Sequence, residues 1–114
     1  MLTEFGKVLR IIRINTSENA GEMAKKLHIS KSYLSSIENG TRNIPIDIEQ
    51  RLYESYDLTL KDKEKIQKAI IESFSVLKID MSQYSDKVKN IICEILNGNI
   101  SESKADEIYR ILKN

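Results

Sequence analysis

A run of polar side chains between Lys31 and Asn39 has the residue types and spacing to hydrogen-bond the edges of nucleic-acid bases. Helical periodicity over residues 31–39 places Leu34 and Ile37 on one side, where they would face a core. The opposite side carries short hydroxyl and amide groups, which can donate hydrogen bonds to base edges in the major groove of DNA and accept bonds from them. The outward face predicted in this way consists of Lys31, Ser32, Ser35, Ser36 and Asn39.

The region around this face is more basic than the chain as a whole. Residues 25–43 contain four cations and a single acid, Glu38, which gives a local net charge of +3, whereas the whole chain has a formal net charge of +1. Lysine and arginine drive DNA binding by neutralising phosphates, so the local charge indicates a DNA contact that the net charge alone does not. The four cations are Lys25, Lys26, Lys31 and Arg42.

Two short helices joined by a tight connector are expected to position the polar face. Asn19 is a good N-cap, and Glu22 three residues later completes a capping-box pattern. Ser30 is an N-cap for the next helix, which Gly40 ends. Helices of about eight residues on either side of a connector of about three have the spacing of a helix-turn-helix. The apolar residues expected between the two helices are Met23, Ala24, Leu27, Ile29, Leu34 and Ile37.

The other segments are also predicted to be helical, because the chain has one proline and four glycines and its apolar residues recur mostly at helical spacing. A first helix of about a dozen residues carries Phe5, Val8, Leu9 and Ile12 and ends in the polar cluster 15–19. A fourth helix starts near Asp47, and Thr59 caps a fifth. Residues 75–81 lose the helical spacing and are interpreted as an extended linker or a short strand.

Two helices are predicted at the end of the chain, the first ending at Gly98 and the second capped by Ser101. Their apolar stripes are larger than one short hairpin can bury, which favours a dimer interface or packing onto the first domain. Cys93 lies on the first stripe and is expected to be a small core residue. We therefore divide the chain into a DNA-binding domain at 1–75 and a helical tail for dimerisation at 76–114. The predicted interface residues are Val88, Ile92, Ile95, Ile108, Ile111 and Leu112.

These motifs together resemble the xenobiotic-response-element (XRE) family of helix-turn-helix regulators, which includes the phage repressors and Cro proteins. The resemblance covers roughly residues 3–58 and is most specific in the run from Ser30 to Gly40. It implies an all-α, phage-repressor-like domain of about four to five helices that binds DNA sequence-specifically as a two-fold dimer and controls transcription. The matching residues are Phe5, Gly6, Leu9, Arg13, Met23, Ala24, Leu27, Ser30 to Gly40, Arg42 and Pro45.

The resemblance also implies roles for individual residues. The positions that match the family's base readers are Lys31, Ser32 and Ser36, with Ser35 at the edge. Arg13 and Glu38 both fall on the inward sides of their helices, and we expect them to form the buried or half-buried ion pair that is common in this family. The positions that match the family's phosphate contacts are Asn39, Thr41, Arg42 and Asn43, and Tyr33, which flanks the recognition helix, is also expected at the DNA backbone.

Three residues depart from the family pattern. Ala20 replaces a common glutamine, so that a side-chain phosphate contact is missing and only the backbone N–H at that helix end could serve. His28 replaces a connector glycine, and either tolerates a left-handed backbone or adds a donor on the groove side. Glu18 replaces an apolar residue just before the second helix.

Other classes of protein find little support in the sequence. One cysteine and one histidine cannot form an internal disulfide or a zinc site, so we expect no metal and no cofactor. There is no paired-carboxylate pocket, no nucleophile with a candidate base and no glycine-rich phosphate loop, so we expect no enzyme activity. Neither a signal peptide nor a membrane span is predicted, and a cytoplasmic, nucleoid-associated bacterial protein is expected.

Two functional hypotheses remain open. The first is a DNA-binding regulator, a repressor from a phage or mobile element, that binds a pseudo-palindromic operator as a homodimer. The second is a protein-interaction module, such as an antitoxin or a host-defence inhibitor, that keeps the helix-turn-helix fold while its tail binds a partner. Double-stranded DNA, a second copy of the chain and a protein at the tail are therefore the expected partners.

Overall fold

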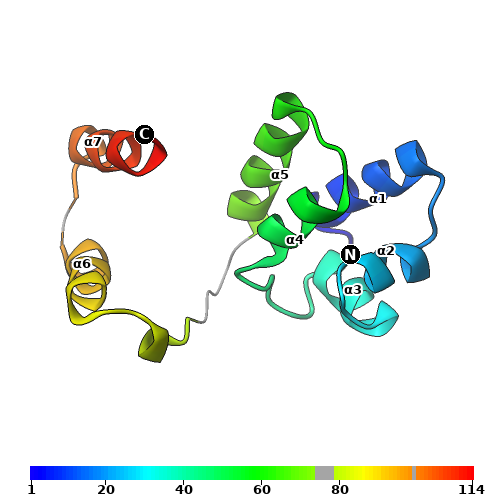
Figure 1. Cartoon of the computed structure of the whole chain (residues 1–114), viewed down its shortest axis with the longest axis horizontal. Helices are drawn as coiled ribbons and strands as arrows, with labels where there is room; N and C mark the ends of the chain where they lie inside the picture. Colours follow the sequence, from blue (N-terminus) through cyan, green and yellow to red (C-terminus); the bar gives the residue numbers. More distant parts are fainter. Residues whose placement is uncertain (74–78, 99) are drawn as a thin grey trace. The chain divides into compact units, whose positions relative to one another are not determined.

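The computed structural model describes residues 1–73, 79–98 and 100–114, and over these residues it is helical, with no β-strand (Figure 1). The prediction of an all-α fold is therefore confirmed. The α-helices are α1 (Glu4–Thr16), α2 (Ala20–Lys26), α3 (Lys31–Glu38), α4 (Ile48–Ser55), α5 (Leu60–Ser73), α6 (Asp86–Asn97) and α7 (Glu102–Lys113), with a 3-10 turn η1 (Met81–Gln83) before α6.

The chain divides into two compact units, Met1–Ile79 and Asp80–Asn114. Residues 75–78, which are most of the segment predicted as a linker or strand, lie outside the described residues. Of the remainder, Ile79 and Asp80 belong to no helix or strand, and Met81 begins η1 rather than continuing an extended segment.

The first unit is built around the apolar faces of its five helices. α1 contacts both α3 and α5, α2 packs against α3, and α4 packs against α5. Complete burial of a leucine, isoleucine or phenylalanine side chain contributes about 1.5–3 kcal/mol, so this cluster is the main source of stability in the unit. Its largest fully buried side chains are Phe5, Leu9, Met23, Leu27, Leu34, Ile37, Ile48, Leu52 and Ile66.

Side-chain caps define where the helices of the first unit begin. The Glu22 backbone N–H donates to Asn19 Oδ1 at 2.8 Å and the Asn19 N–H donates to Glu22 Oε1 at 3.0 Å, so the predicted capping box is confirmed. Ser30 Oγ accepts from the Tyr33 N–H at 3.0 Å and begins α3. Thr59 and Asp62 make the same reciprocal exchange at the start of α5, each at 3.1 Å.

The turn between α2 and α3 depends on an uncommon backbone conformation. His28 has φ 59°, in the left-handed region, so the first alternative given for this residue, tolerance of a left-handed backbone, is confirmed. The Ile29 N–H then donates to the Ala24 carbonyl at 3.0 Å and closes the turn. α1 also extends further into the polar cluster than the pattern predicts, as far as Thr16. Ser17 (φ 56°) then ends the helix, and its N–H donates to the Ile14 carbonyl.

The second unit is a pair of helices without a closed core. None of its described residues is buried, although α6 and α7 both carry apolar stripes. Cys93 is exposed on α6, so the expectation of a core cysteine is wrong for the single chain, because no described residue covers it. Within the unit, Ile91, Ile95 and Ile108 line a hollow of about 580 Å³.

Candidate DNA interface

The polar face of α3 points away from the core of the first unit. Lys31, Ser32 and Ser35 are exposed and Ser36 is half-buried, whereas Leu34, Ile37 and Glu38 on the other side are buried. The structure thus gathers the four predicted base readers on one accessible side of a single helix. Their side chains are short, so a base edge could come close to the helix backbone in a major groove.

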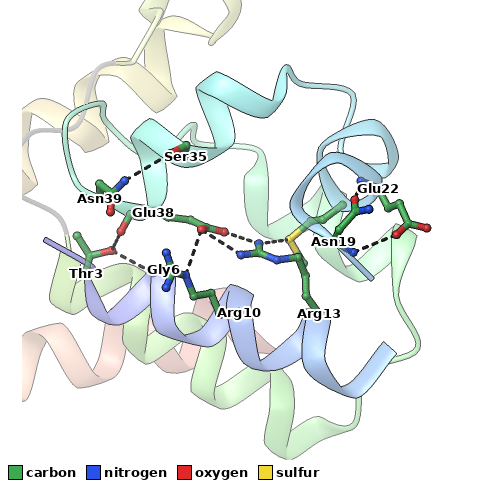
Figure 2. Close-up of polar contacts among 10 residues, drawn as sticks. Thr3, Gly6, Arg10, Arg13, Asn19, Glu22, Ser35, Glu38 and Asn39 are labelled. Carbon is green, nitrogen blue, oxygen red and sulfur yellow. Dashed lines mark hydrogen bonds and ion pairs between the residues drawn. The ribbon is translucent and has the colours of Figure 1, made fainter. Parts of the chain in front are cut away.

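The serine hydroxyls of this face already make local hydrogen bonds. Ser36 Oγ donates to the Ser32 carbonyl at 3.0 Å, and Ser30 Oγ lies 3.3 Å from Ser32 Oγ. Asn39 Nδ2 donates to Ser35 Oγ at 3.4 Å (Figure 2). Each hydroxyl keeps a further lone pair or can rotate its proton, so the same groups can still bond a base without leaving a buried group unpaired.

Four of the five residues predicted at the DNA backbone follow α3 in an exposed loop. Asn39, Thr41, Arg42 and Asn43 are all exposed, and Tyr33 is half-buried beside them. The loop is tied to α3 at one atom, because the Ser36 carbonyl accepts from the Thr41 N–H at 3.0 Å and from the Arg42 N–H at 3.2 Å. Gly40 makes the turn that allows this with φ 77°, a conformation that favours glycine.

The structure brings Arg13 of α1 and Glu38 of α3 into a bidentate ion pair (Figure 2). Arg13 Nη1 lies 2.5 Å from Glu38 Oε2, and Nη2 lies 3.2 Å from Oε1. The two side chains are 10% and 5% exposed, so solvent screens the pair only weakly. Met23 Sδ accepts a further bond from Arg13 Nη1 at 3.2 Å, which joins α2 to the same cluster. The pair therefore fixes the end of α3 to α1.

Thr3 is part of this junction and is a residue that the sequence analysis missed. Its Oγ1 accepts from the Gly6 N–H and donates to the Glu38 carbonyl, both at 3.0 Å, and its own N–H donates to that carbonyl at 2.9 Å (Figure 2). Thr3 is therefore at once the N-cap of α1 and a cap for the end of α3. A threonine just before an apolar helical pattern is an N-cap signal, but its partner on α3 is 35 residues away.

Gly6 allows the close approach of α1 to the end of α3. A Cβ atom at this position would clash with the carbonyl oxygen of Glu38 and would lie 2.8 Å from Leu2 Cδ1. Any larger residue would push the two helices apart at the point where Thr3 joins them. The match of Gly6 to the family pattern thus has a steric reason.

Glu18 and Lys26 pair at the start and the end of α2, and this changes the charge near the DNA-binding face. Lys26 Nζ lies 2.8 Å from Glu18 Oε2 and 4.7 Å from the centre of the Tyr56 ring. The hydrogen bond from Lys26 lowers the pKa of the Glu18 carboxyl below its usual value. Burial raises the pKa of the Tyr56 hydroxyl above its usual value. Of the four local cations, Lys26 is therefore engaged within the fold.

Within residues 1–73, 79–98 and 100–114, no helix has the length and apolarity needed to cross a bilayer.

Comparison with known proteins agrees with this geometry. The model of a helix-turn-helix family matches residues 9–62, which include α2, α3 and α4, most of α1 and the first residues of α5. No curated protein and no solved structure gave a significant match to the chain. The match over residues 9–62 supports an XRE-type helix-turn-helix domain, as found in DNA-binding regulators.

Proposed function

We propose that this protein is a transcriptional repressor, from a phage or a mobile element, that binds a pseudo-palindromic operator as a homodimer and acts at the bacterial nucleoid. The observation that carries the proposal is the exposed hydroxyl face of α3 on a helix whose inner side is bonded to α1 through Arg13 and Glu38. A helix held this firmly presents its outer side chains in a defined geometry, and specific base contacts require that.

In this proposal the residues of α3 have distinct roles. Lys31 is a cation at the first position of the helix and would donate to guanine O6 or N7. Ser32 and Ser36, one turn apart, would donate to base edges or accept from them, with Ser35 at the margin. Phosphate contacts from the exposed loop after α3, at Asn39, Thr41, Arg42 and Asn43, would set the register of the helix in the groove.

The homodimer is proposed from the second unit. A short helical hairpin is only marginally stable by itself, and the apolar stripes of α6 and α7 stay open in the single chain. Val88 is 38% exposed, Ile95 40%, Ile111 74% and Leu112 77%, whereas Ile92 and Ile108 are half-buried. Two such hairpins related by a two-fold axis would cover each other's stripes, because a two-fold interface pairs the same surface with itself.

The same open stripes support a second candidate function. A protein partner could bind α6 and α7 in place of a second copy, as the antitoxin or host-defence inhibitor hypothesis requires. DNA binding and a protein partner at the tail are compatible functions.

Selection of bound sequences from random duplex DNA, with the purified full chain, tests the proposal. We expect a motif with two inverted half-sites whose centres are separated by about 34 Å or a multiple of it, one helical turn of DNA. Enrichment of a single asymmetric half-site would contradict the homodimer. Failure to enrich any motif, with partner capture through residues 80–114, would favour the interaction module.

A further inference from the structure

We propose that Tyr33 is a positioning residue for Arg42: its ring holds the guanidinium so that the N–H groups are directed to a DNA phosphate. The inference rests on the proposed DNA-binding function and gives Tyr33 a different role from the direct backbone contact predicted from the sequence.

The first observation is the contact between the two side chains. Arg42 Cζ lies 5.4 Å from the centre of the Tyr33 ring, within the range of a cation–π contact. Tyr33 is half-buried and packs against the hydrophobic core of the first unit, so the orientation of its ring is fixed by its neighbours. The ring is therefore a firm surface for the guanidinium of an otherwise exposed arginine.

The second observation is that the backbone of Arg42 is held as well. Its N–H donates to the Ser36 carbonyl at 3.2 Å, and the Thr41 N–H and hydroxyl donate to the same oxygen at 3.0 Å and 3.2 Å. Two residues after Arg42, Ile44 is buried in the core. The backbone of Arg42 is thus bonded to α3, and its guanidinium contacts a ring that also belongs to α3.

The third observation concerns which groups of the guanidinium remain available. A cation–π contact uses no hydrogen bond of the guanidinium, so its N–H groups, which are the ones that bond phosphate, remain available. No ion pair among the described residues involves Arg42, whereas Arg13 bonds Glu38 and Arg51 bonds Asp47 through their edges. Thr41, Asn43 and Pro45 join Tyr33 and Arg42 around a hollow of about 410 Å³, which gives a phosphate room to approach.

The energetic benefit is one of pre-organisation. An arginine side chain that is already immobilised loses less conformational freedom when it binds, and typical values for such ordering correspond to a change in affinity of about threefold to tenfold. A direct contact from the Tyr33 hydroxyl to phosphate would act differently, because it would depend on the oxygen rather than on the ring. A variant that keeps the ring and removes the hydroxyl separates the two mechanisms.

The test is a double-mutant cycle measured by fluorescence anisotropy with a labelled duplex. Tyr33→Leu keeps an apolar side chain of similar reach but removes the ring, and we expect it to weaken binding about threefold to tenfold. Tyr33→Phe should bind as the wild type does. In the Arg42→Ala background, Tyr33→Leu should have no further effect, because the residue it positions is absent. Equal losses for the Phe and Leu variants, or a full loss from Tyr33→Leu without Arg42, overturn the inference.

A measurement on the free protein makes the test independent of operator identity. The ring should shift the NMR signals of the Arg42 δ-methylene protons upfield in the wild type and in Tyr33→Phe, and Tyr33→Leu should abolish that shift. Random-coil shifts for Arg42 in the wild type contradict the contact. If the wild type binds the selected and scrambled duplexes equally, base reading fails while the cycle can still be measured; if it binds no duplex, both proposals are overturned.

Discussion

At the residue scale, Glu38 makes the contacts that join the end of α3 to α1. Its carboxylate oxygens bond Arg13 of α1, and the backbone carbonyl of Glu38 accepts two hydrogen bonds from Thr3. Arg13 and Glu38 were predicted as partners from their positions on the inward sides of their helices together with the ion pair that is common in the resembling family. The contact of Thr3 could not be predicted in this way, because Thr3 bonds a backbone carbonyl. Every residue has such a carbonyl, so the residue type of Glu38 does not mark it as the partner.

Replacement of Arg13 by Met should lower the free energy of unfolding by about 3–5 kcal/mol, because it leaves the Glu38 carboxylate buried without its main partner. Urea unfolding followed by circular dichroism measures this loss. The matched control is Arg10→Met: Arg10 is 56% exposed and 3.8 Å from Glu38, so we expect a loss below about 1 kcal/mol. A similar small loss for both variants would show that the Arg13 pair is not effectively buried.

The contribution of Glu18 should depend on pH. Its folded-state pKa is lowered by the hydrogen bond from Lys26, so the ionised carboxyl stabilises the fold at pH values above its unfolded pKa, about 4.3. That contribution is lost as the pH falls through the lower folded-state pKa. The wild type should therefore exceed Glu18→Gln in stability at pH 7, and the difference should shrink below about pH 4.

Denaturant titrations of both proteins between pH 3 and pH 7 measure this difference. Glu64→Gln is the control, since Glu64 is exposed on α5 and is in no ion pair among the described residues. A stability difference for Glu18→Gln that stays constant across this range, or that grows toward low pH, contradicts the assigned role of the Lys26 contact.

At the scale of the elements, local signals were sufficient to place most helix starts, whereas contacts between helices were harder to predict. The caps at Asn19, Ser30, Thr59 and Ser101 lie where the sequence predicts them, because a cap bonds an N–H group only two or three residues away. The close approach of α1 to the end of α3 at Gly6 depends on the fold, so sequence alone gave the residue but not its reason.

Gly6→Ala should destabilise the first unit by about 1–3 kcal/mol, since the added methyl group clashes with the Glu38 carbonyl. The control is Gly21→Ala in α2, where the new Cβ would meet Asn19 Oδ1 at 3.3 Å and alanine is the better helix former. We expect that variant to stay within about 1 kcal/mol of the wild type. Thermal unfolding of the three proteins compares them, and a Gly6→Ala protein as stable as Gly21→Ala would contradict the packing.

At the scale of the whole molecule, the two units pose different problems for prediction. The residues of the first unit bury one another, so their periodicity identified the core. The stripes of α6 and α7 are just as regular, but no residue of either helix is buried, and periodicity cannot name what would cover the stripes. The homodimer therefore remains a prediction from the open stripes.

Removal of residues 80–114 should leave a folded first unit, because its core is complete without them, and should abolish dimerisation in sedimentation velocity. In the full chain, Ile95→Glu should also give a monomer, since it places a charge on the α6 stripe. Ile14→Glu is the control: Ile14 is 75% exposed on α1, and the dimer should tolerate the change. A dimer that survives truncation, or one broken only by Ile14→Glu, places the interface on the first unit.

The central claim is that α3 reads bases while the loop after it anchors the protein, and one binding measurement tests it directly. Lys31→Ala, Ser36→Ala and Arg42→Ala are each titrated against the selected duplex and a scrambled one at several salt concentrations. The α3 variants should lose about 1–3 kcal/mol on the selected site and little on the scrambled one. Arg42→Ala should lose equally on both, with a salt slope shallower by about 0.9 per subunit. Equal losses on both duplexes for Lys31→Ala and Ser36→Ala would show that α3 does not read bases.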